Sequence, residues 1–282
     1  MNTAARQHTL WDASTPRRLI HLLDRRDPWL TRTGVFLLLL LVPCYLASLF
    51  DPRLFEGAGV WVKPMKFQLS VGLYLLTVAW FMAYTRPEFQ VSRRRRWLSG
   101  MLVTAALFEV LYITLQGALA QASHFNESDA LHSFLYSLMG LGAVMLALMV
   151  GWQAVEIAGH RKPRLPIVLH WSIAWGLLLT AVLTIIAGFT ISTYQSPIIG
   201  LPRSEADGIW LFGWATNSGD LRVAHFLGTH AMHIIPTTTW LLIRISTNKA
   251  GLWLGFTLLT FIAAWVVTYL SALAGSSFLP FV

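Results

Sequence analysis

The sequence has little charge for its length. Only 12% of its 282 residues are Asp, Glu, Lys or Arg, whereas 55% are hydrophobic. A soluble domain carries roughly twice that charged fraction. The shortage argues against a water-soluble domain and against a disordered chain. The net charge of +8 is therefore to be explained by its location, and we expect no nucleic-acid partner.

Cysteine is nearly absent, since Cys44 is the only one in the chain. This excludes a disulfide framework and a zinc or iron–sulfur site built on cysteines. The chain also has no Walker motif, dinucleotide fingerprint or nucleophile elbow. Its last hydrophobic run has no lysine that could carry a retinal Schiff base. These absences leave a polytopic membrane protein as the class to consider.

Long hydrophobic runs are what the sequence has in abundance. A membrane-spanning helix needs about 20 mainly apolar residues. Seven runs predict an all-α integral membrane bundle with seven transmembrane helices, at 33–50, 67–84, 97–121, 131–158, 166–192, 221–243 and 250–273. We expect residues 1–32 to form a basic cytoplasmic tail and residues 33–282 to form the transmembrane domain.

The distribution of basic residues predicts the orientation. Sixteen of the 21 lysines and arginines fall in the tail and in the loops after the second, fourth and sixth spans. Cytoplasmic loops carry the excess of these residues. We therefore expect a cytoplasmic N-terminus and an outside C-terminus, in the cell membrane or, in a Gram-negative bacterium, the inner membrane. In the tail, Thr15 and Pro16 suit the start of a short helix on the membrane surface.

Ionisable residues inside the spans are the strongest functional signal, because each is costly in a bilayer. The sixth span contains His225, His230 and His233, and the third contains Glu109. At about 1.5 Å per residue, Glu109 and His233 come out at similar depth near the middle of the membrane. We predict that these two residues form a proton-transferring pair. Further polar residues expected to line the site are Tyr112, Gln116, Asn126 and Asp220, the last of which also suits the helix N-cap.

A cofactor is the second expectation from the same residues. Histidine is a common axial ligand of haem b and a common ligand of transition metals. His225 is expected near the outer surface, with His132 or His124 as a second ligand from another helix. The basic residues placed to meet haem propionates are Arg222, Lys66 and Lys63. A metal ion alone would draw on His225, His230 and His233.

Small residues at four-residue spacing have a structural interpretation. In the fifth span they are Thr180, Thr184, Gly188 and Ser192. Small residues allow membrane helices to approach closely. We interpret this stripe as a packing seam.

Three segments carry a resemblance to known sequences: WVKPMKF, ASHFN and GDLRVAHFLGTHAMHIIP. They resemble segments of uncharacterised bacterial polytopic membrane proteins, over a region from the second to the sixth span. The resemblance implies a seven-span membrane protein and implies no activity.

Three functions fit these observations. The first is a haem- or metal-binding redox protein with its site in the outer half. The second is a carrier or lipid-handling protein that binds a small anionic solute or headgroup from the outer side and uses a Glu–His proton relay. The third is a membrane sensor or assembly factor.

The charge asymmetry yields a direct test of topology. A reporter that is active only outside the cytoplasm should be active when fused after Val282. The same reporter fused after residue 160 should be inactive, because the loop after the fourth span is expected in the cytoplasm. A cytoplasmic C-terminus would contradict the odd number of spans.

Overall fold

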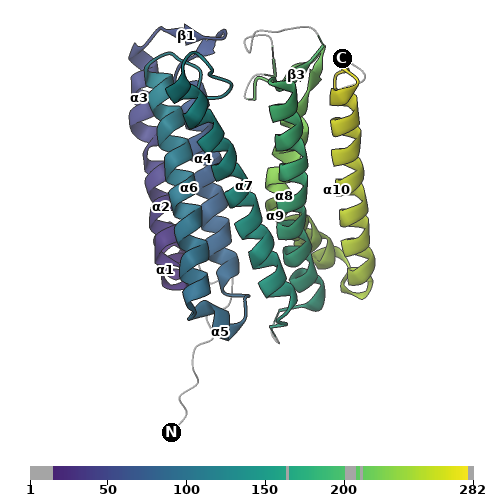
Figure 1. Ribbon diagram of the computed structural model, residues 1–282. Helices are drawn as coiled ribbons and strands as arrows, with labels where there is room; N and C mark the ends of the chain where they lie inside the picture. The colour runs from purple at the N-terminus through teal and green to yellow at the C-terminus, as the bar shows by residue number, and fades with distance from the viewer. Residues whose placement is uncertain (1–14, 163–164, 201–207, 210–211, 279–282) are drawn as a thin grey trace.

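The computed structural model describes residues 15–162, 165–200, 208–209 and 212–278. Most of these residues lie in long helices that run roughly side by side (Figure 1). Two short hairpins lie at one end of the bundle, which we call the hairpin end. The short helix α5 lies at the other, which we call the α5 end (Figure 1). The topology predicted from the sequence makes the hairpin end the outer one.

The long helices follow the predicted spans closely. They are α2 (Pro28–Leu39), α3 (Leu41–Phe50), α4 (Val62–Met82), α6 (Arg93–Ala118), α7 (Ala130–Ala158), α8 (Ile167–Tyr194), α9 (Leu221–Ile245) and α10 (Ala250–Leu273). Shorter elements are α1 (Pro16–Arg26), α5 (Pro87–Gln90) and a 3-10 turn at Thr247–Lys249. The hairpins pair β1 (Leu54–Phe55) with β2 (Ala58–Gly59), and β3 (Ile198–Ile199) with β4 (Gly219–Asp220), both antiparallel.

Six helical segments among the described residues are long and apolar enough to cross a membrane. The first combines α2 and α3 as Pro28–Phe50, and the others are α4, α6, α7, α8 and α10. These helices are consistent with an integral, multi-pass membrane protein. Helix α9 is of similar length and packs beside α8 and α10, but it is less hydrophobic because it carries three histidines and two arginines.

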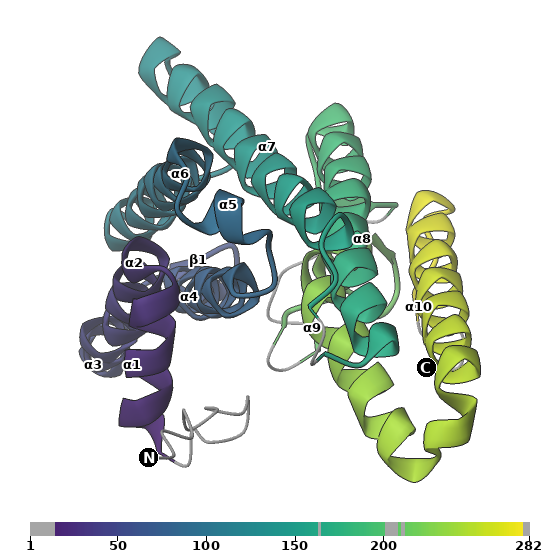
Figure 2. The ribbon, with the colours of Figure 1, turned by 90° about the horizontal axis from the view of Figure 1, so that it is seen from below.

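The bundle has two groups of helices joined by α7. Helices α2, α3, α4 and α6 form one group, and α8, α9 and α10 form the other (Figure 2). The long helix α7 crosses between them, packing on α6 and on α8 (Figures 1 and 2). One hydrophobic core lies within the first group and extends to α7 and α8, and a second lies between α8, α9 and α10.

Helix α1 runs across the α5 end, not along the bundle axis (Figure 2). Thr15 caps it by accepting a hydrogen bond from the Arg18 N–H, and Pro16 is its first residue, as the sequence predicts. The next helix already begins at Pro28, so the expected boundary between tail and membrane domain at residue 32 falls inside α2. Residues 1–14 of the tail lie outside the described residues.

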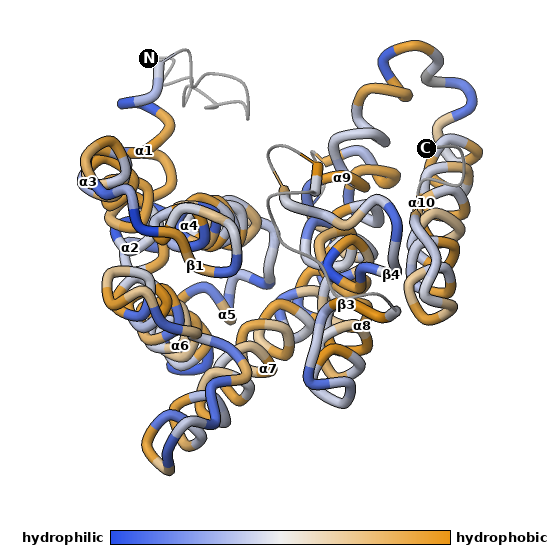
Figure 3. The backbone as a smooth tube through the Cα atoms, turned by 90° about the horizontal axis from the view of Figure 1, so that it is seen from above, coloured by the Kyte–Doolittle hydropathy of each residue, from blue (hydrophilic) through white to orange (hydrophobic). Residues whose placement is uncertain are grey.

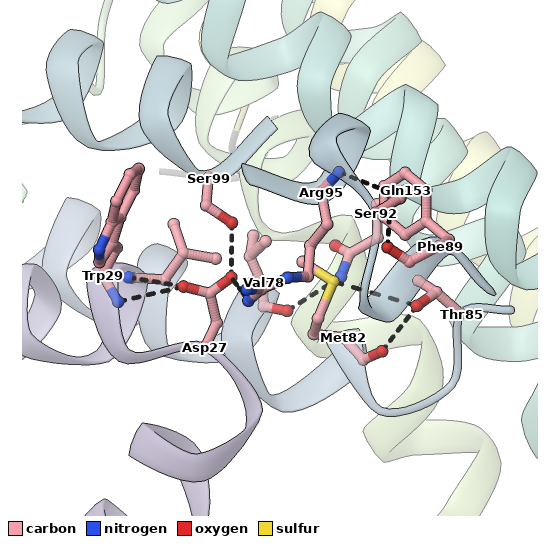
Figure 4. Close-up of polar contacts among 11 residues, drawn as sticks. Asp27, Trp29, Val78, Met82, Thr85, Phe89, Ser92, Arg95, Ser99 and Gln153 are labelled. Carbon is pink, nitrogen blue, oxygen red and sulfur yellow. Dashed lines mark hydrogen bonds and ion pairs between the residues drawn. The ribbon is translucent and has the colours of Figure 1, made fainter. Parts of the chain in front are cut away.

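A buried polar network ties α1, α2 and α6 together at the α5 end (Figure 4). The Asp27 side chain is 1% exposed. Its Oδ1 caps α2 by accepting the N–H groups of Trp29 and Leu30, each at 3.1 Å. Its Oδ2 accepts from Arg95 Nη1 at 2.9 Å and from the Ser99 hydroxyl. One carboxylate therefore fixes where the first membrane helix starts and where α6 lies against it.

The end of α4 is closed in a related way. Its last carbonyls accept hydrogen bonds from Arg26 at Trp80 O, from Gln153 at Val78 O and from Lys162 at Ala83 O. Cations suit this position because a helix C-terminus carries partial negative charge.

Three of the four residues of the predicted seam, Thr180, Thr184 and Gly188, lie at the contact between α8 and α9. Glycines outside that stripe lie there too: a Cβ on Gly176 would lie 3.2 Å from the Ala231 carbonyl oxygen, and one on Gly228 would lie 3.0 Å from the backbone of Leu183. The Thr180 hydroxyl accepts the N–H of Met232 at 2.9 Å, in the turn before Pro236. Small residues thus bring the backbone of α9 close to α8.

Hydrophobic residues cover the outward sides of the helices as well as the interior (Figure 3). Many large ones are exposed on the bundle surface, among them Leu39, Phe50, Leu259 and Leu270. In a membrane this surface would face lipid chains, which require no polar coat.

Replacing Asp27 by Ala should destabilise the protein strongly. The change removes a helix cap and leaves the Arg95 guanidinium without its carboxylate, and breaking such a buried pair costs about 3–5 kcal/mol. Thermal unfolding in detergent measures the effect. The control is Asp24→Ala, which removes the exposed pair with Arg32 and should cost under about 1 kcal/mol. Equal losses for both variants would contradict the role assigned to Asp27.

Candidate functional site

Four histidines form a file from the hairpin end to the middle of the bundle. His124 lies in the loop between α6 and α7, and His225, His230 and His233 follow along α9. Each lies within electrostatic range of the next. We call these four residues the histidine column. Asp220 starts α9 by accepting the Arg222 N–H at 2.9 Å, as predicted, and so sets the positions of the three helical members.

The lower part of the column is a chain of hydrogen bonds. The Nδ1 atoms of His230 and His233 are 3.2 Å apart. The Nε2 atom of His233 lies 2.9 Å from the Thr77 hydroxyl of α4, which itself donates to the Leu73 carbonyl at 2.8 Å. His233 lies about 18 Å along α9 from the hairpin end, and Thr77 about 22 Å along α4. The chain therefore reaches the middle of the bundle, the depth expected for His233 from the sequence.

The hydrogen-bond directions define the tautomers. The Thr77 hydrogen is used on the Leu73 carbonyl, so His233 Nε2–H donates to the Thr77 oxygen. His233 Nδ1 then carries a lone pair, and it accepts from His230 Nδ1–H. The remaining lone pair of the chain is on His230 Nε2. That nitrogen is the position at which a proton can enter the chain.

The upper part of the column is less polar. The Nδ1 atom of His225 is buried and has no hydrogen-bond partner among the described residues. Its ring lies against Gly188 of α8, the position where a side chain would contact it. His124 packs beside Phe67 and Tyr136, and its Nδ1 lies 3.1 Å from the Ser123 hydroxyl.

The pKa of His124 lies well below its ordinary value. Burial is the first cause, and the positive charges of Lys63 and His225 add to it. Since His124 is neutral at neutral pH, one nitrogen of its imidazole can accept a hydrogen bond, and the ring does not repel a cation.

Glu109 lies apart from the column. It is 8% exposed on α6, and its Oε2 is buried without a hydrogen-bond partner among the described residues. Glu109 interacts electrostatically with Tyr74 of α4. The hydrogen bonds of His233 go to Thr77 of α4 and to His230. The partner expected from depth alone is thus replaced by a threonine of α4.

The basic residues proposed for propionates hold the loop before α9. Arg222 pairs with Asp220 at 2.8 Å and donates to the Gly213 carbonyl at 2.7 Å. Lys66 donates to the Phe212 carbonyl at 3.0 Å. Phe212 stacks on Trp214, and both rings contact Phe226 of α9. These contacts close the loop over the hairpin end of α9.

Other expected lining residues have local structural contacts. His132 forms an ion pair with Asp129, the N-cap of α7, at 2.7 Å. Asn126 closes its own loop through the Ala122 carbonyl. On α6, the buried Gln116 side-chain amide donates to the Tyr112 hydroxyl at 2.8 Å. The structure does not bring these four residues together with His233.

The described residues bear on metal ligation and on water access. They contain no group of three or more His, Cys, Asp or Glu side chains arranged to hold a metal ion. At the hairpin end, a cavity of about 50 Å³ is lined by Lys63, Gln121, Ser123 and other residues. A water needs about 10–15 Å³ of such space, so the cavity can hold water beside the loop of His124.

Thr77 is a residue of the candidate site that sequence reasoning missed. A threonine in a span ordinarily bonds to its own helix, and Thr77 also does this through Leu73. Nothing in the residue pattern distinguishes it from Thr190 or Thr268, which make the same bond. Only the approach of α9 to α4 identifies it.

Comparison with protein-family models, with curated proteins and with solved structures gave no match. The class that the fold and the site define is a multi-pass helical membrane protein with a histidine column in its interior.

The tautomers can be tested by nitrogen-15 NMR of histidine side chains in nanodiscs. At neutral pH we expect His233 to be protonated on Nε2 and His230 on Nδ1, since each hydrogen bond of the chain needs one donor and one acceptor. Thr77→Val removes the hydroxyl and should change the His233 signals while leaving those of His132, on α7, unaltered. The opposite tautomer at His233 would contradict the assigned chain.

Proposed function

We propose that this protein is a proton-linked membrane carrier in which the histidine column relays protons between the hairpin end and the middle of the bilayer. The observation that supports the proposal is the hydrogen-bonded chain Thr77–His233–His230. Ionisable residues inside a membrane bundle are typical of proton relays.

The chemistry of the column suits proton transfer better than storage of charge. Neighbouring imidazoles repel each other when both are protonated, so the column favours one proton at a time. A proton arriving at His230 Nε2 is balanced by loss of the His230 Nδ1 proton to His233 Nδ1. The His233 Nε2 proton is then released to a water or to the carried solute, because the Thr77 hydroxyl stays bonded to the Leu73 carbonyl. Each imidazole returns to its resting state when its ring reorients.

The carried solute is proposed to be a small anion entering from the hairpin end. Lys63 lies within electrostatic range of His124 there, and the water-sized cavity adjoins the same loop. A proton taken up with an anion cancels its charge, which lowers the cost of crossing the bilayer.

For the topology we propose seven crossings, with the N-terminus in the cytoplasm and the C-terminus outside. Helix α9 is about 37 Å long, sufficient to cross a hydrocarbon core of about 30 Å. The proposal is supported by the positions of α1 at the α5 end and of the last turn of α10 at the hairpin end (Figure 1).

Proton movement in proteoliposomes tests the function. The lumen contains the pH dye pyranine, and a potassium gradient with valinomycin drives protons inward, with and without external phosphate or succinate as anionic probes. We expect faster acidification than in protein-free liposomes. His233→Ala should reduce the rate at least tenfold, because it removes both hydrogen bonds of the relay.

The matched control is His132→Ala, which removes a partly exposed histidine paired with Asp129 and should leave the rate unchanged. Absence of proton movement under every condition would overturn the proposal. Equal rates for the wild-type protein and His233→Ala would do the same.

A second candidate function is a redox protein with haem b or a transition metal held by His225 and His124. The favouring observation is the buried, unpartnered Nδ1 of His225 together with the nearby imidazole of His124. Purified protein should then show a Soret band or stoichiometric iron, copper or zinc, and His225→Ala should remove it. A colourless protein without bound metal would end this candidate.

A further inference from the structure

The run of four arginines at the start of α6 divides its side chains between different environments. Arg95 turns inward to the buried Asp27. Arg93 and Arg96 instead border a depression of about 560 Å³ on the surface at the α5 end. Arg94 is exposed and does not border it. One short sequence thus provides a structural arginine, two arginines at a depression and one on the open surface.

The other residues that line the depression are mainly apolar and belong to three helices. Trp29 belongs to α2, Trp97, Gly100, Met101 and Thr104 to α6, and Met145 to α7. Trp29 is 52% exposed and Trp97 is 70% exposed. The Trp29 ring lies over Gly100, where a Cβ would be 3.5 Å from it. Glycine therefore keeps the floor flat beside the indole.

The order of side chains along α6 matches a lipid. Arg93 and Arg96 are three residues apart, hence on one helix face. The floor of the depression continues along α6 to Thr104, about 16 Å from Arg93 toward the bilayer centre. Guanidinium groups bind phosphate in a bidentate manner, and tryptophans favour the headgroup level of a membrane. A phosphate at the arginines would thus place its acyl chains on Gly100, Met101 and Met145.

We propose that this depression binds an anionic glycerophospholipid of the leaflet at the α5 end. Charge complementarity at the arginines selects a negatively charged headgroup, and the apolar floor between α2, α6 and α7 selects attached acyl chains. A basic pocket between membrane helices is a known form of lipid recognition. The site lies at the opposite end of the bundle from His124 and does not depend on the proposed proton relay.

Native mass spectrometry of the full chain in detergent tests the proposal, with phosphatidylglycerol and phosphatidylcholine as probes. We expect the wild-type protein to retain phosphatidylglycerol more tightly than phosphatidylcholine. Arg93→Gln combined with Arg96→Gln should weaken phosphatidylglycerol binding at least tenfold. The control Arg94→Gln removes the same charge from the same run and should change binding less than twofold.

A second variant tests the apolar floor. Gly100→Leu keeps every arginine but fills the depression beside Trp29, so it should weaken phosphatidylglycerol binding as the double arginine variant does. Thermal unfolding of each variant verifies that it is folded. Binding that is unchanged in the double variant, or lost equally in Arg94→Gln, would overturn the site. Displacement of the lipid by millimolar inorganic phosphate would show that the depression recognises a free anion.

Discussion

The structure depends on one constraint: polar groups surrounded by apolar helices must find their partners within the protein, since hydrocarbon supplies none. Asp27 meets this constraint with two backbone N–H groups, an arginine and a serine. Gln153 meets it with a carbonyl of α4. The Thr180 hydroxyl meets it as well, since it accepts the N–H of Met232 in α9. Each of these contacts fixes one helix against another.

The hydrogen bonds of the histidine column meet the same constraint, but they leave one nitrogen able to bind a proton. Thr77 and the two imidazoles of His230 and His233 satisfy one another, and one nitrogen lone pair remains for a proton. A chain of this kind is stable when neutral. It can pass a proton along its hydrogen bonds, after which each imidazole ring reorients. Glu109 is different, since its buried Oε2 has no partner among the described residues. The histidine column therefore provides no partner for the Glu109 carboxyl group.

The two ends of the bundle use their charges differently. At the hairpin end, Arg222 and Lys66 are engaged by a loop, so they close the bundle over α9. At the α5 end, one arginine of four is buried with Asp27 while Arg93 and Arg96 border an apolar depression. The distribution of basic residues therefore indicates the topology. The further role of an individual lysine or arginine depends on the groups that it contacts.

The sequence by itself determined the helices, because hydrophobic runs and caps are local: the long helices lie within a few residues of the predicted spans, and Thr15 and Asp220 cap as expected. It also singled out the histidines, because charge in an apolar run is visible without a structure. Only the tertiary structure decided their partners. Depth along a helix gives only one of three coordinates. It predicted a pair of Glu109 and His233 because the two residues have similar depths. The structure instead places His233 of α9 within hydrogen-bond distance of Thr77 of α4, which depth along a helix does not reveal.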